Sequence, residues 1–260
     1  DFPITSSESA SLVIGQLDFE TSNNGTAADM FCWPSEVAVD EAGNLYVVEP
    51  VTGLGDEGNS RVMVFTPPLS IGMAASIVLG QSDFDTVVYY DCSPTGLYGP
   101  RSIVVDSSGN VYVTDMFNNR ALKYEAPLSS GMAATMVIGQ TDLYSSGSGC
   151  TSSMLNYPYG IALDGEGNLY VSDTENNRVL RFSAPLTTGM EADLVLGQAD
   201  FFSGDPNQGG SCAANTLNRP RGMDVDSEGN IYVIDTNNNR LLLYRKGFSP
   251  SAEVTREVPD

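Results

Sequence analysis

One pattern of four parts occurs four times in this chain. The first part reads PSEVAVD, PRSIVVD, PYGIALD and PRGMDVD, the second GNLYVVE, GNVYVTD, GNLYVSD and GNIYVID, and the third NSRVMVF, NNRALKY, NNRVLRF and NNRLLLY. The fourth part is a VLGQ-like phrase, whose glycines Gly80, Gly139 and Gly197 are separated by 59 and then 58 residues. A repeat of this length predicts one supersecondary unit stacked several times.

Each part predicts a β-strand, because it alternates β-branched and aromatic residues between turn residues. The first and second parts are joined by DEAGN, DSSGN, DGEGN and DSEGN, in which Asp and Gly favour a tight hairpin. Asn-rich segments such as DTENNR follow, where Asn tolerates left-handed backbone. We therefore predict an all-β chain of four-stranded antiparallel meanders that bury one another around an axis, as the blades of a β-propeller do.

The pattern PxGxAxDxxGNxYVxDxxNNRVxxF in these units resembles the NHL repeat, and APLTTGMEADLVLGQADF resembles a long-loop variety found in bacterial surface and secreted proteins. The resemblance implies a β-propeller, usually of six blades, whereas this chain has four units. We expect one four-bladed domain of NHL-like blades over residues 1–248 and a C-terminal tail over residues 249–260.

The N-terminal phrase SLVIGQLDF repeats the fourth part without a unit before it, while the last unit has no fourth part. We predict that strand 11–16 pairs with Leu241–Tyr244, completes the last blade and closes the ring, which removes two open sheet edges. Two other arrangements account for the same number of strands. The strand enters the last blade of a neighbouring molecule, giving self-assembly by strand exchange, or two chains form a larger closed ring.

The composition narrows the classes of partner. The chain has 12 Lys and Arg against 33 Asp and Glu, a net charge of −21, which disfavours nucleic acid. No run of 18 apolar residues occurs, so no membrane span is expected. The chain starts at Asp1 without a basic-then-apolar leader, which we interpret as a mature or trimmed form. The predicted location is extracellular or the cell surface.

The chain contains no histidine, so the commonest general base and metal ligand is absent. This excludes Ser-His-Asp and Cys-His chemistry and His-ligated zinc. We expect no catalytic residues and a non-catalytic binding, adhesive or structural surface module, or a subunit of a larger assembly or filament. The alternative follows from resemblance to lactonases and lyases among NHL-like propellers: a calcium-dependent enzyme with Ca²⁺ in the central channel.

Asp224 is the one candidate metal ligand, because it stands where the other units have Ala38, Val104 and Ala162. We expect this position to be packed between blades, where a buried Asp needs partners or a raised pKa. The alternative interpretation is that Asp224 has a structural role and is held by hydrogen bonds.

The repeated acids and arginines are predicted to be structural. The aspartates after each Gly-Gln are expected to cap a turn rather than form a calcium ring, and each blade is expected to contain one Arg–acid ion pair. The capping residues are Asp18, Asp83, Asp142 and Asp200, and the pairs are Arg61–Glu49, Arg120–Asp115, Arg178–Asp173 and Arg240–Asp235.

The cysteines occur once per unit, at Cys32, Cys92, Cys150 and Cys212. Two disulfides in an oxidising compartment are predicted with the pairing left open, and a thiolate metal site or free thiols are the alternatives. Asn24 begins an Asn-Gly-Thr glycosylation sequence.

Aromatic residues in the long loops are candidates for contact with a protein or a glycan, or for covering the blade tops. An insertion between Glu49 and Arg61 is a further candidate surface for a partner. The aromatic candidates are Phe31, Trp33, Tyr89, Tyr90, Phe201 and Phe202.

Overall fold

The computed structural model describes residues 9–51 and 58–247, and these ranges form four antiparallel sheets. The first sheet consists of β1 (Glu36–Val39), β2 (Leu45–Val51), β3 (Gly58–Phe65) and β4 (Ile77–Leu79). The second consists of β5 (Pro100–Val105), β6 (Val111–Asp115), β7 (Arg120–Tyr124) and β8 (Met136–Ile138). The third consists of β9 (Pro158–Leu163), β10 (Leu169–Asp173), β11 (Arg178–Phe182) and β12 (Leu194–Leu196). The fourth has three described strands, β13 (Pro220–Val225), β14 (Ile231–Asp235) and β15 (Arg240–Tyr244).

The turns have the chemistry that the repeat predicts. Between β9 and β10, a carboxylate oxygen of Asp164 accepts hydrogen bonds from the amides of Glu166 and Asn168, each at 2.9 Å. Between β10 and β11, Asn177 has the left-handed backbone, with φ of 54°. Short 3-10 helices precede the third strand in the later blades and occur once in a loop: η1 (Met116–Asn118), η2 (Thr174–Asn176), η3 (Pro206–Gly209) and η4 (Thr236–Asn238).

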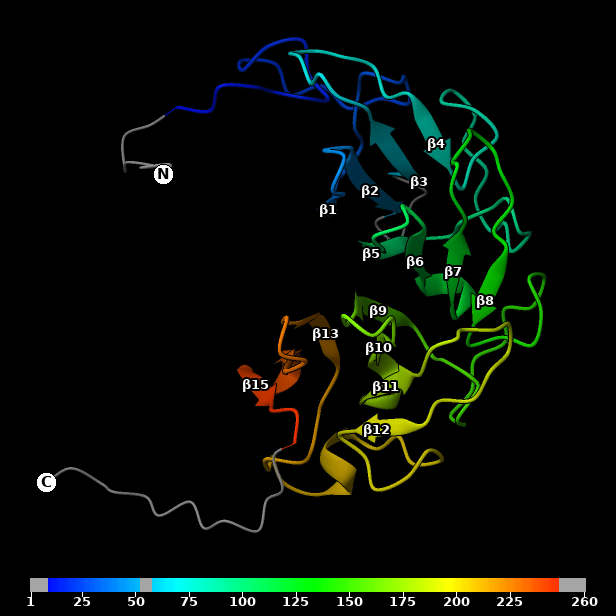
Figure 1. Cartoon of the computed structure of the whole chain (residues 1–260), viewed down its shortest axis with the longest axis vertical. Coiled ribbons are helices and arrows are strands. Elements are labelled where there is room, and N and C mark those ends of the chain that lie inside the picture. Colours follow the sequence, from blue (N-terminus) through cyan, green and yellow to red (C-terminus); the bar gives the residue numbers. More distant parts are fainter. Residues whose placement is uncertain (1–8, 52–57, 248–260) are drawn as a thin grey trace, which may run out of the picture.

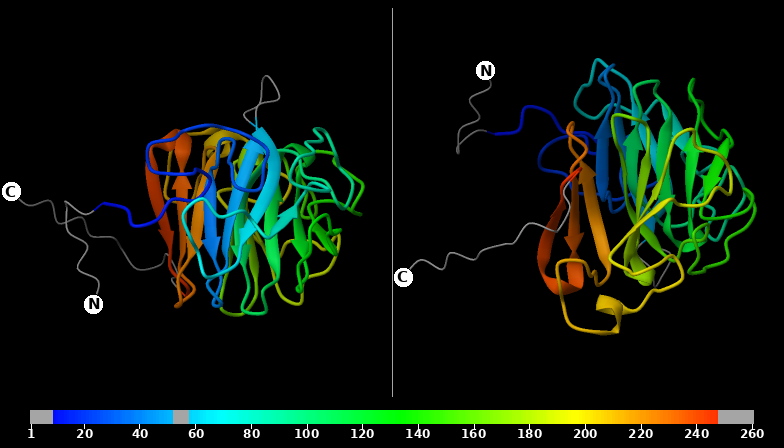
Figure 2. Two further views of the ribbon diagram at one scale, coloured as in Figure 1. Left: turned by 90° about the horizontal axis from the view of Figure 1, so that it is seen from above. Right: turned by 60° about the horizontal axis from the view of Figure 1, so that its bottom comes forward.

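The four blades stand side by side along an arc, with β1, β5, β9 and β13 on its inner side (Figure 1). Figure 2 shows the strands running across the thickness of the arc. Apolar side chains fill each boundary between neighbouring blades. Val48 and Val113 belong to the core between the first two blades, Ile161 to the next, and Tyr170 and Val233 to the last. The predicted all-β architecture of stacked propeller blades is confirmed.

The N-terminal segment does not lie where the strand count placed it. Residues 9–20 form no strand, and β15 pairs only with β14 among the described strands. Val13 instead accepts a hydrogen bond from the amide of Gly72 at 3.3 Å, and Ile14 packs with the core of the first blade. This segment therefore lies at the β1 end of the arc rather than completing the fourth sheet.

One edge of the arc, the loop face, carries η1, η2, η4 and the long loops before the first strand of each blade. The tail at 249–260 and residues 52–57 of the predicted insertion lie outside the described residues. Within the described ranges, no helix has the length and apolar character needed to cross a membrane.

Candidate functional site

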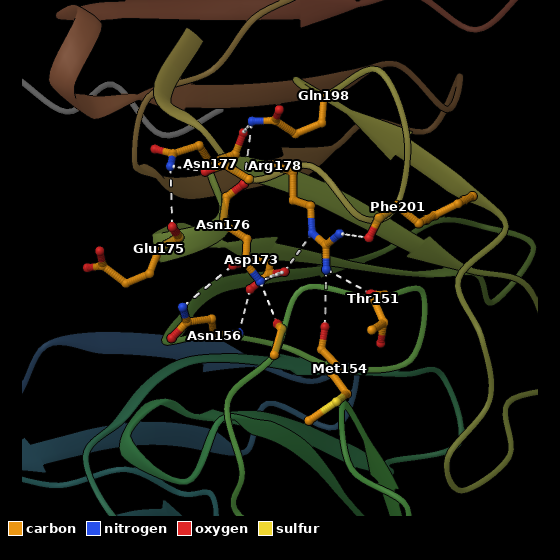
Figure 3. Close-up of polar contacts among 12 residues, drawn as sticks. Thr151, Met154, Asn156, Asp173, Glu175, Asn176, Asn177, Arg178, Gln198 and Phe201 are labelled. Carbon is orange, nitrogen blue, oxygen red and sulfur yellow. Dashed lines mark hydrogen bonds and ion pairs between the residues drawn. The ribbon is translucent and has the colours of Figure 1, made fainter. Parts of the chain in front are cut away.

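Arg178 and Asp173 form a buried ion pair that ties loops together at the loop face (Figure 3). Arg178 Nε donates to Asp173 Oδ2 at 2.7 Å, and both side chains are fully buried. The terminal nitrogens donate to the carbonyl of Phe201 at 2.5 Å and to those of Thr151 and Met154 at 2.8 and 3.1 Å. One guanidinium therefore holds loops that precede and follow the blade.

Asp173 has further partners, since it accepts from the Asn156 amide at 2.6 Å and from Asn176 Nδ2 at 2.8 Å. The predicted ion pair is confirmed in every blade, so these arginines have a structural role. The equivalent pairs are Arg61–Glu49, Arg120–Asp115 and Arg240–Asp235.

The aspartates after Gly-Gln cap turns, as predicted. Asp18 accepts from the amides of Glu20 and Thr21 at 2.9 and 2.8 Å, and Asp200 accepts from those of Phe202 and Ser203, both at 2.8 Å. Backbone donors stabilise the ionised form, which lowers the pKa of Asp18.

A pocket of about 280 Å³ opens where three inner strands begin. Arg101, Tyr159 and Arg221 each follow the proline that starts β5, β9 or β13, so the repeat places them in one row. The proline fixes the start of each strand, and the next side chain projects beside the neighbouring blade. The pocket is lined by Arg101, Met116, Tyr157, Tyr159, Thr174, Glu175, Arg219 and Arg221.

Two arginines of this pocket stack on aromatic rings. The guanidinium carbon of Arg101 lies 5.8 Å from the Tyr159 ring centre and 6.0 Å from that of Phe117. That of Arg221 lies 5.4 Å from the same Tyr159 ring. A ring face attracts a cation without neutralising it. The rings therefore hold two guanidinium groups together and leave their charge available.

The hydrogen-bond donors of the pocket are incompletely used. Arg101 Nη2 donates to the Val51 carbonyl at 3.2 Å, whereas its buried Nε has no partner among the described residues. Arg219 forms an ion pair with Glu175, and its Nε is likewise unpartnered within the described ranges. Burial, reinforced by the nearby charge of Arg221 and opposed by Tyr159, lowers the pKa of Arg101. Three arginines against one glutamate in the lining give this pocket the charge and the donors that an anionic group would need.

A row of rings leads from the pocket along the loop face. Ring centres lie 4.7 Å apart between Tyr90 and Tyr98, 4.7 Å between Tyr98 and Phe117, and 5.6 Å between Phe117 and Tyr157. Gly99 makes this possible, because a Cβ there would lie 2.4 Å from the Phe117 ring. Tyr90 at the outer end is 67% exposed. The pocket is therefore continuous with an aromatic surface.

The aromatic candidates from the sequence have different positions. Tyr90 belongs to the row just described, whereas Phe31 packs edge-on against Phe65 at 5.8 Å and covers the first blade. Phe201 packs against the core between the second and third blades. Tyr89 donates its hydroxyl to the Gly58 carbonyl at 3.1 Å.

The last two aromatic candidates, Trp33 and Phe202, are exposed. The structure gathers one of the six candidates into the pocket surface. It adds Arg101, Tyr159 and Arg221, which the sequence analysis did not identify. The sequence signal that could have found them is the position directly after the proline of each unit. It is Ser35 in the first unit and Arg101, Tyr159 and Arg221 in the later ones, whereas the strand pattern that follows it repeats.

Asp224 is exposed, which corrects the expectation that it is packed between blades. It lies on β13 in the last blade of the arc, opposite Tyr232, and accepts from the amide of Val225 at 2.8 Å. No group of three His, Cys, Asp or Glu side chains suited to a metal occurs among the described residues.

The cysteines lie in the loops of separate blades. Cys92 Sγ donates to the Tyr144 carbonyl at 3.3 Å, Cys150 packs near Gly204, and Cys212 is exposed. In the described structure these three form no disulfide, because each contacts backbone of the following loop or solvent rather than another thiol. Cys32 is buried, and its amide donates to Glu49 at 2.5 Å. Asn24 is exposed, so its glycosylation stays a prediction.

Comparisons with known proteins give the following similarities. A family model described as the NHL repeat matches residues 97–122, 155–182 and 217–242. Teneurin-1 of Gallus gallus is 26% identical over 204 residues, and that of Homo sapiens is 24% identical over 204 residues. Each alignment includes 73% of this chain and 7% of the relative, so the chain spans a small part of these proteins.

Two solved structures are also similar. A streptogramin B lyase structure has a TM-score of 0.45 and 14% identity, covering 84% of this chain and 56% of that one. A catalytically inactive virginiamycin B lyase from Staphylococcus aureus, solved with quinupristin, has a TM-score of 0.43 and 10% identity, covering 83% and 56%.

Proposed function

The chain is an NHL-repeat protein of propeller blades, and on that premise we propose that it acts as a non-catalytic extracellular binding module. The observation that carries this proposal is the pocket of Arg101, Arg219 and Arg221 beside Tyr157 and Tyr159. Arginine and tyrosine dominate the binding energy of protein interfaces, because they combine apolar area with directed hydrogen bonds. The partner is a protein that inserts an acidic side chain into this pocket and lies along the aromatic row.

The charge of the whole chain specifies the partner further. A net charge of −21 repels polyanions at long range, whereas the pocket attracts a carboxylate at short range. The partner therefore presents a single carboxylate on a neutral or basic surface. An acidic glycan that stacks on the same rings is the competing occupant, and the experiment below separates the two.

The enzyme alternative, a lactonase- or lyase-like propeller using Ca²⁺, receives less support from this site. The inner strands begin with Arg101 and Arg221 at the pocket, and two guanidinium groups repel a divalent cation there. Stoichiometric calcium found by metal analysis of the purified protein would favour the enzyme.

The proposed extracellular or cell-surface location is supported by the resemblance of the long loops to those of secreted proteins. Thiol counting under denaturing conditions tests one part of it. Four free thiols would contradict the oxidised form that the sequence analysis predicted. Mass analysis of the native glycoprotein would report whether Asn24 is modified.

The binding proposal is tested by selecting peptides from a random phage-displayed library on the purified chain. We expect the selected peptides to share an acidic residue. Their affinity, measured by calorimetry, should fall at least tenfold in Arg101→Ala and in Arg221→Ala, and equally when the peptide acid becomes an amide.

Arg181→Ala is the matched control, because Arg181 forms an exposed ion pair with Asp193 away from the pocket, and it should leave the affinity unchanged. Selected peptides without an acid, or full affinity in both pocket variants, would refute the proposal. Binding to an acidic sugar on a glycan array, lost in Arg221→Ala, would replace the protein partner by a glycan.

A further inference from the structure

The two ends of the arc expose apolar side chains whose counterparts at the interior boundaries are buried or partly buried. On the fourth blade, Leu241 is 55% exposed, whereas its counterpart Val179 in the third blade is 1% exposed. On the first blade, Val37 is 61% exposed, whereas Ile103 and Ile161 in the same column are 5% and 4% exposed. Each end therefore has the surface of a blade boundary without the neighbouring blade.

The boundary between the third and fourth blades supplies a template of polar contacts. Thr174 Oγ1 donates to the Pro220 carbonyl at 2.7 Å, and Asn177 Oδ1 accepts from the Arg219 amide at 2.8 Å. Gln198 Nε2 donates to the Asn177 carbonyl at 3.0 Å.

The preceding boundary repeats two of these contacts. Asn119 Oδ1 accepts from the Tyr157 amide at 2.9 Å, and Gln140 donates to the Asn119 carbonyl at 2.8 Å. The side-chain and backbone contacts are therefore a property of the repeat rather than of one blade pair.

The fourth blade presents the Thr and Asn half of this template without the neighbouring blade that would complete it. Thr236 occupies the position of Thr174, and its buried Oγ1 has no hydrogen-bond partner in the described residues. Asn239 occupies the position of Asn177, with the same left-handed backbone at φ of 53°. A buried hydroxyl without a partner costs free energy, so a neighbour that accepts from Thr236 would stabilise this end.

The first blade presents the complementary half. Trp33 stands where Arg219 stands, directly before the proline, and has φ of 55° against 52°. Gln16 stands where Gln198 stands and keeps the local contact with Asn23, donating at 2.6 Å and accepting at 3.1 Å. The backbone of the first blade at Trp33 therefore has the same conformation as the equivalent residue at an interior blade boundary.

The N-terminal segment completes the correspondence. Val13 accepts from Gly72 as Val78 accepts from Gly131 and as Val137 accepts from Gly189. In the last two cases the acceptor belongs to the outer strand of the preceding blade, β4 or β8. Residues 11–16 therefore lie where the outer strand of a blade before the first would lie, and β15 is the strand that lacks such a partner.

We propose that a second copy of this chain docks on the fourth blade through its own first blade, head to tail. Residues 11–16 of that copy add the fourth strand to β15. The register of β11 with β12, in which Val179 opposes Leu196, places Leu241 opposite Ile14 and Leu242 opposite Val13. Trp33 and Pro34 of that copy supply the amide and carbonyl for Asn239 and Thr236.

A second copy fits as the occupant because, within the described residues, each end of the arc carries the half of a blade boundary that the other end lacks, and Leu241 and Val37 stay exposed. Two chains of four blades give eight, within the range of about four to eight for closed propellers. A heterologous contact of this kind makes a ring if its rotation closes.

The first experiment measures the mass of the full chain by sedimentation. We expect a species of about 55 kDa, twice the 27.7 kDa of one chain, at micromolar concentration and 0.15 M salt. Leu241→Lys and Val37→Lys should each raise the dissociation constant at least 100-fold. Tyr144→Lys, at a 70% exposed loop position, is the matched control and should assemble like the parent.

Mixing the two defective variants should restore a two-chain species, since one boundary between them keeps both native faces. Failure of the mixture to associate, or a parent chain that stays monomeric at all concentrations, would overturn the proposal. Because each copy carries the same net charge of −21, association should also strengthen as salt is raised from 0.05 to 0.5 M.

A cross-link tests the register and the choice of chain together. Chains carrying Val13→Cys and chains carrying Leu242→Cys, one of them isotope-labelled, should form a mixed disulfide that peptide mapping identifies. Leu12→Cys replaces Val13→Cys in the control, which shifts the register by one residue and should cross-link at least tenfold less. A Val13→Cys/Leu242→Cys double variant that links within single chains instead would establish self-closure and reject the second copy.

Discussion

The arginines of this protein occupy two contrasting regions. Arg178 and its three counterparts lie on the third strands of their blades, and each pairs with a carboxylate at 2.6 or 2.7 Å. Arg101 and Arg221 lie where inner strands begin, stacked on Tyr159, and neither forms an ion pair with a carboxylate of the described residues. Charge is therefore compensated at the position that is invariant in the repeat, and lacks an ion pair among the described residues at the position that varies.

The two groups of arginines also differ in how far their position in the repeat varies, where a column means the equivalent position in all four units. The Arg and acid columns are constant apart from one Glu, whereas each of the two columns after the proline holds three residue types across the four units. Ser35, Arg101, Tyr159 and Arg221 fill the first of them, and Glu36, Ser102, Gly160 and Gly222 fill the second. A position inside the blade must pair with the same buried groups in every unit, so its residue is constant. A position on the surface has no such requirement, so its residue can vary and contact a ligand.

The largest effect is expected from breaking a buried pair. Asp173→Ala leaves Arg178 buried and uncompensated, so the free energy of unfolding should fall by about 3–5 kcal/mol. Urea unfolding at pH 7 measures it. Asp235→Ala should cost less, because its partner Arg240 has a side chain 24% exposed to water. Equal losses in the two variants would contradict the argument from burial.

A smaller loss is expected at Gly160, in the variable region. A Cβ at this position would lie 2.2 Å from the backbone oxygen of Arg221 in the neighbouring blade, so Gly160→Ala must displace β13. We expect about 1–3 kcal/mol of destabilisation and weaker ligand binding, because Arg221 moves.

Gly222→Ala is the matched control for Gly160→Ala in the same column. Its Cβ would meet the Ile234 side chain at 3.2 Å, which lies at the open end and can rotate away. A loss of stability in Gly222→Ala as large as that in Gly160→Ala would show that backbone approach is not the cause.

The same contrast explains what the sequence could predict. Arg178 and Asp173 were paired correctly because four copies of one spacing require one structural explanation. Arg101 and Tyr159 were not singled out, because neither residue type nor spacing reveals that strands from different blades bring them to one pocket. Asp224 was misplaced for a related reason: a column that is buried or partly buried in interior blades becomes exposed at the end of an arc, and the repeat does not show whether the fourth unit contacts another blade.

The N-terminal phrase shows where strand counting stops. The missing fourth strand after Tyr244 and the extra phrase at 11–16 are both present in the sequence and both observed. Counting strands pairs the extra segment with the missing strand, but it does not show whether the two belong to the same molecule. That information lies in Gly72 and Phe31, whose contacts with Val13 and Gly15 hold the segment on the first blade.

Glu36, in the variable region, gives a pH-dependent effect from a partly buried carboxyl that lies outside the Arg–acid pairs. Burial raises the pKa of Glu36 to about 7, although Ser102 donates a hydrogen bond to it at 3.0 Å. Between pH 4.5 and 7 the folded state holds this proton more tightly than the unfolded state, so stability falls as the pH rises through this window. The side chain is partly exposed, so the loss is about 1–2 kcal/mol after allowing for solvent screening.

Glu36→Gln should therefore be more stable than the parent at pH 8 and equal to it at pH 4.5. Urea unfolding at several pH values measures the difference. A parent and variant with parallel stability curves would remove Glu36 as the cause.

The smallest effect is expected from an ion pair that neither region uses. Arg181 and Asp193 pair at 2.8 Å on the surface of the third blade, with side chains 30% and 44% exposed. Asp193→Ala should change the free energy of unfolding by about 0.2–1 kcal/mol, and the change should disappear at 1 M salt. Asp173→Ala should keep its full cost in the same salt, because water and ions do not reach that pair. A salt-sensitive Asp173→Ala would mean that the blade opens around the buried arginine, and the contrast between the two regions would then be one of dynamics rather than of burial.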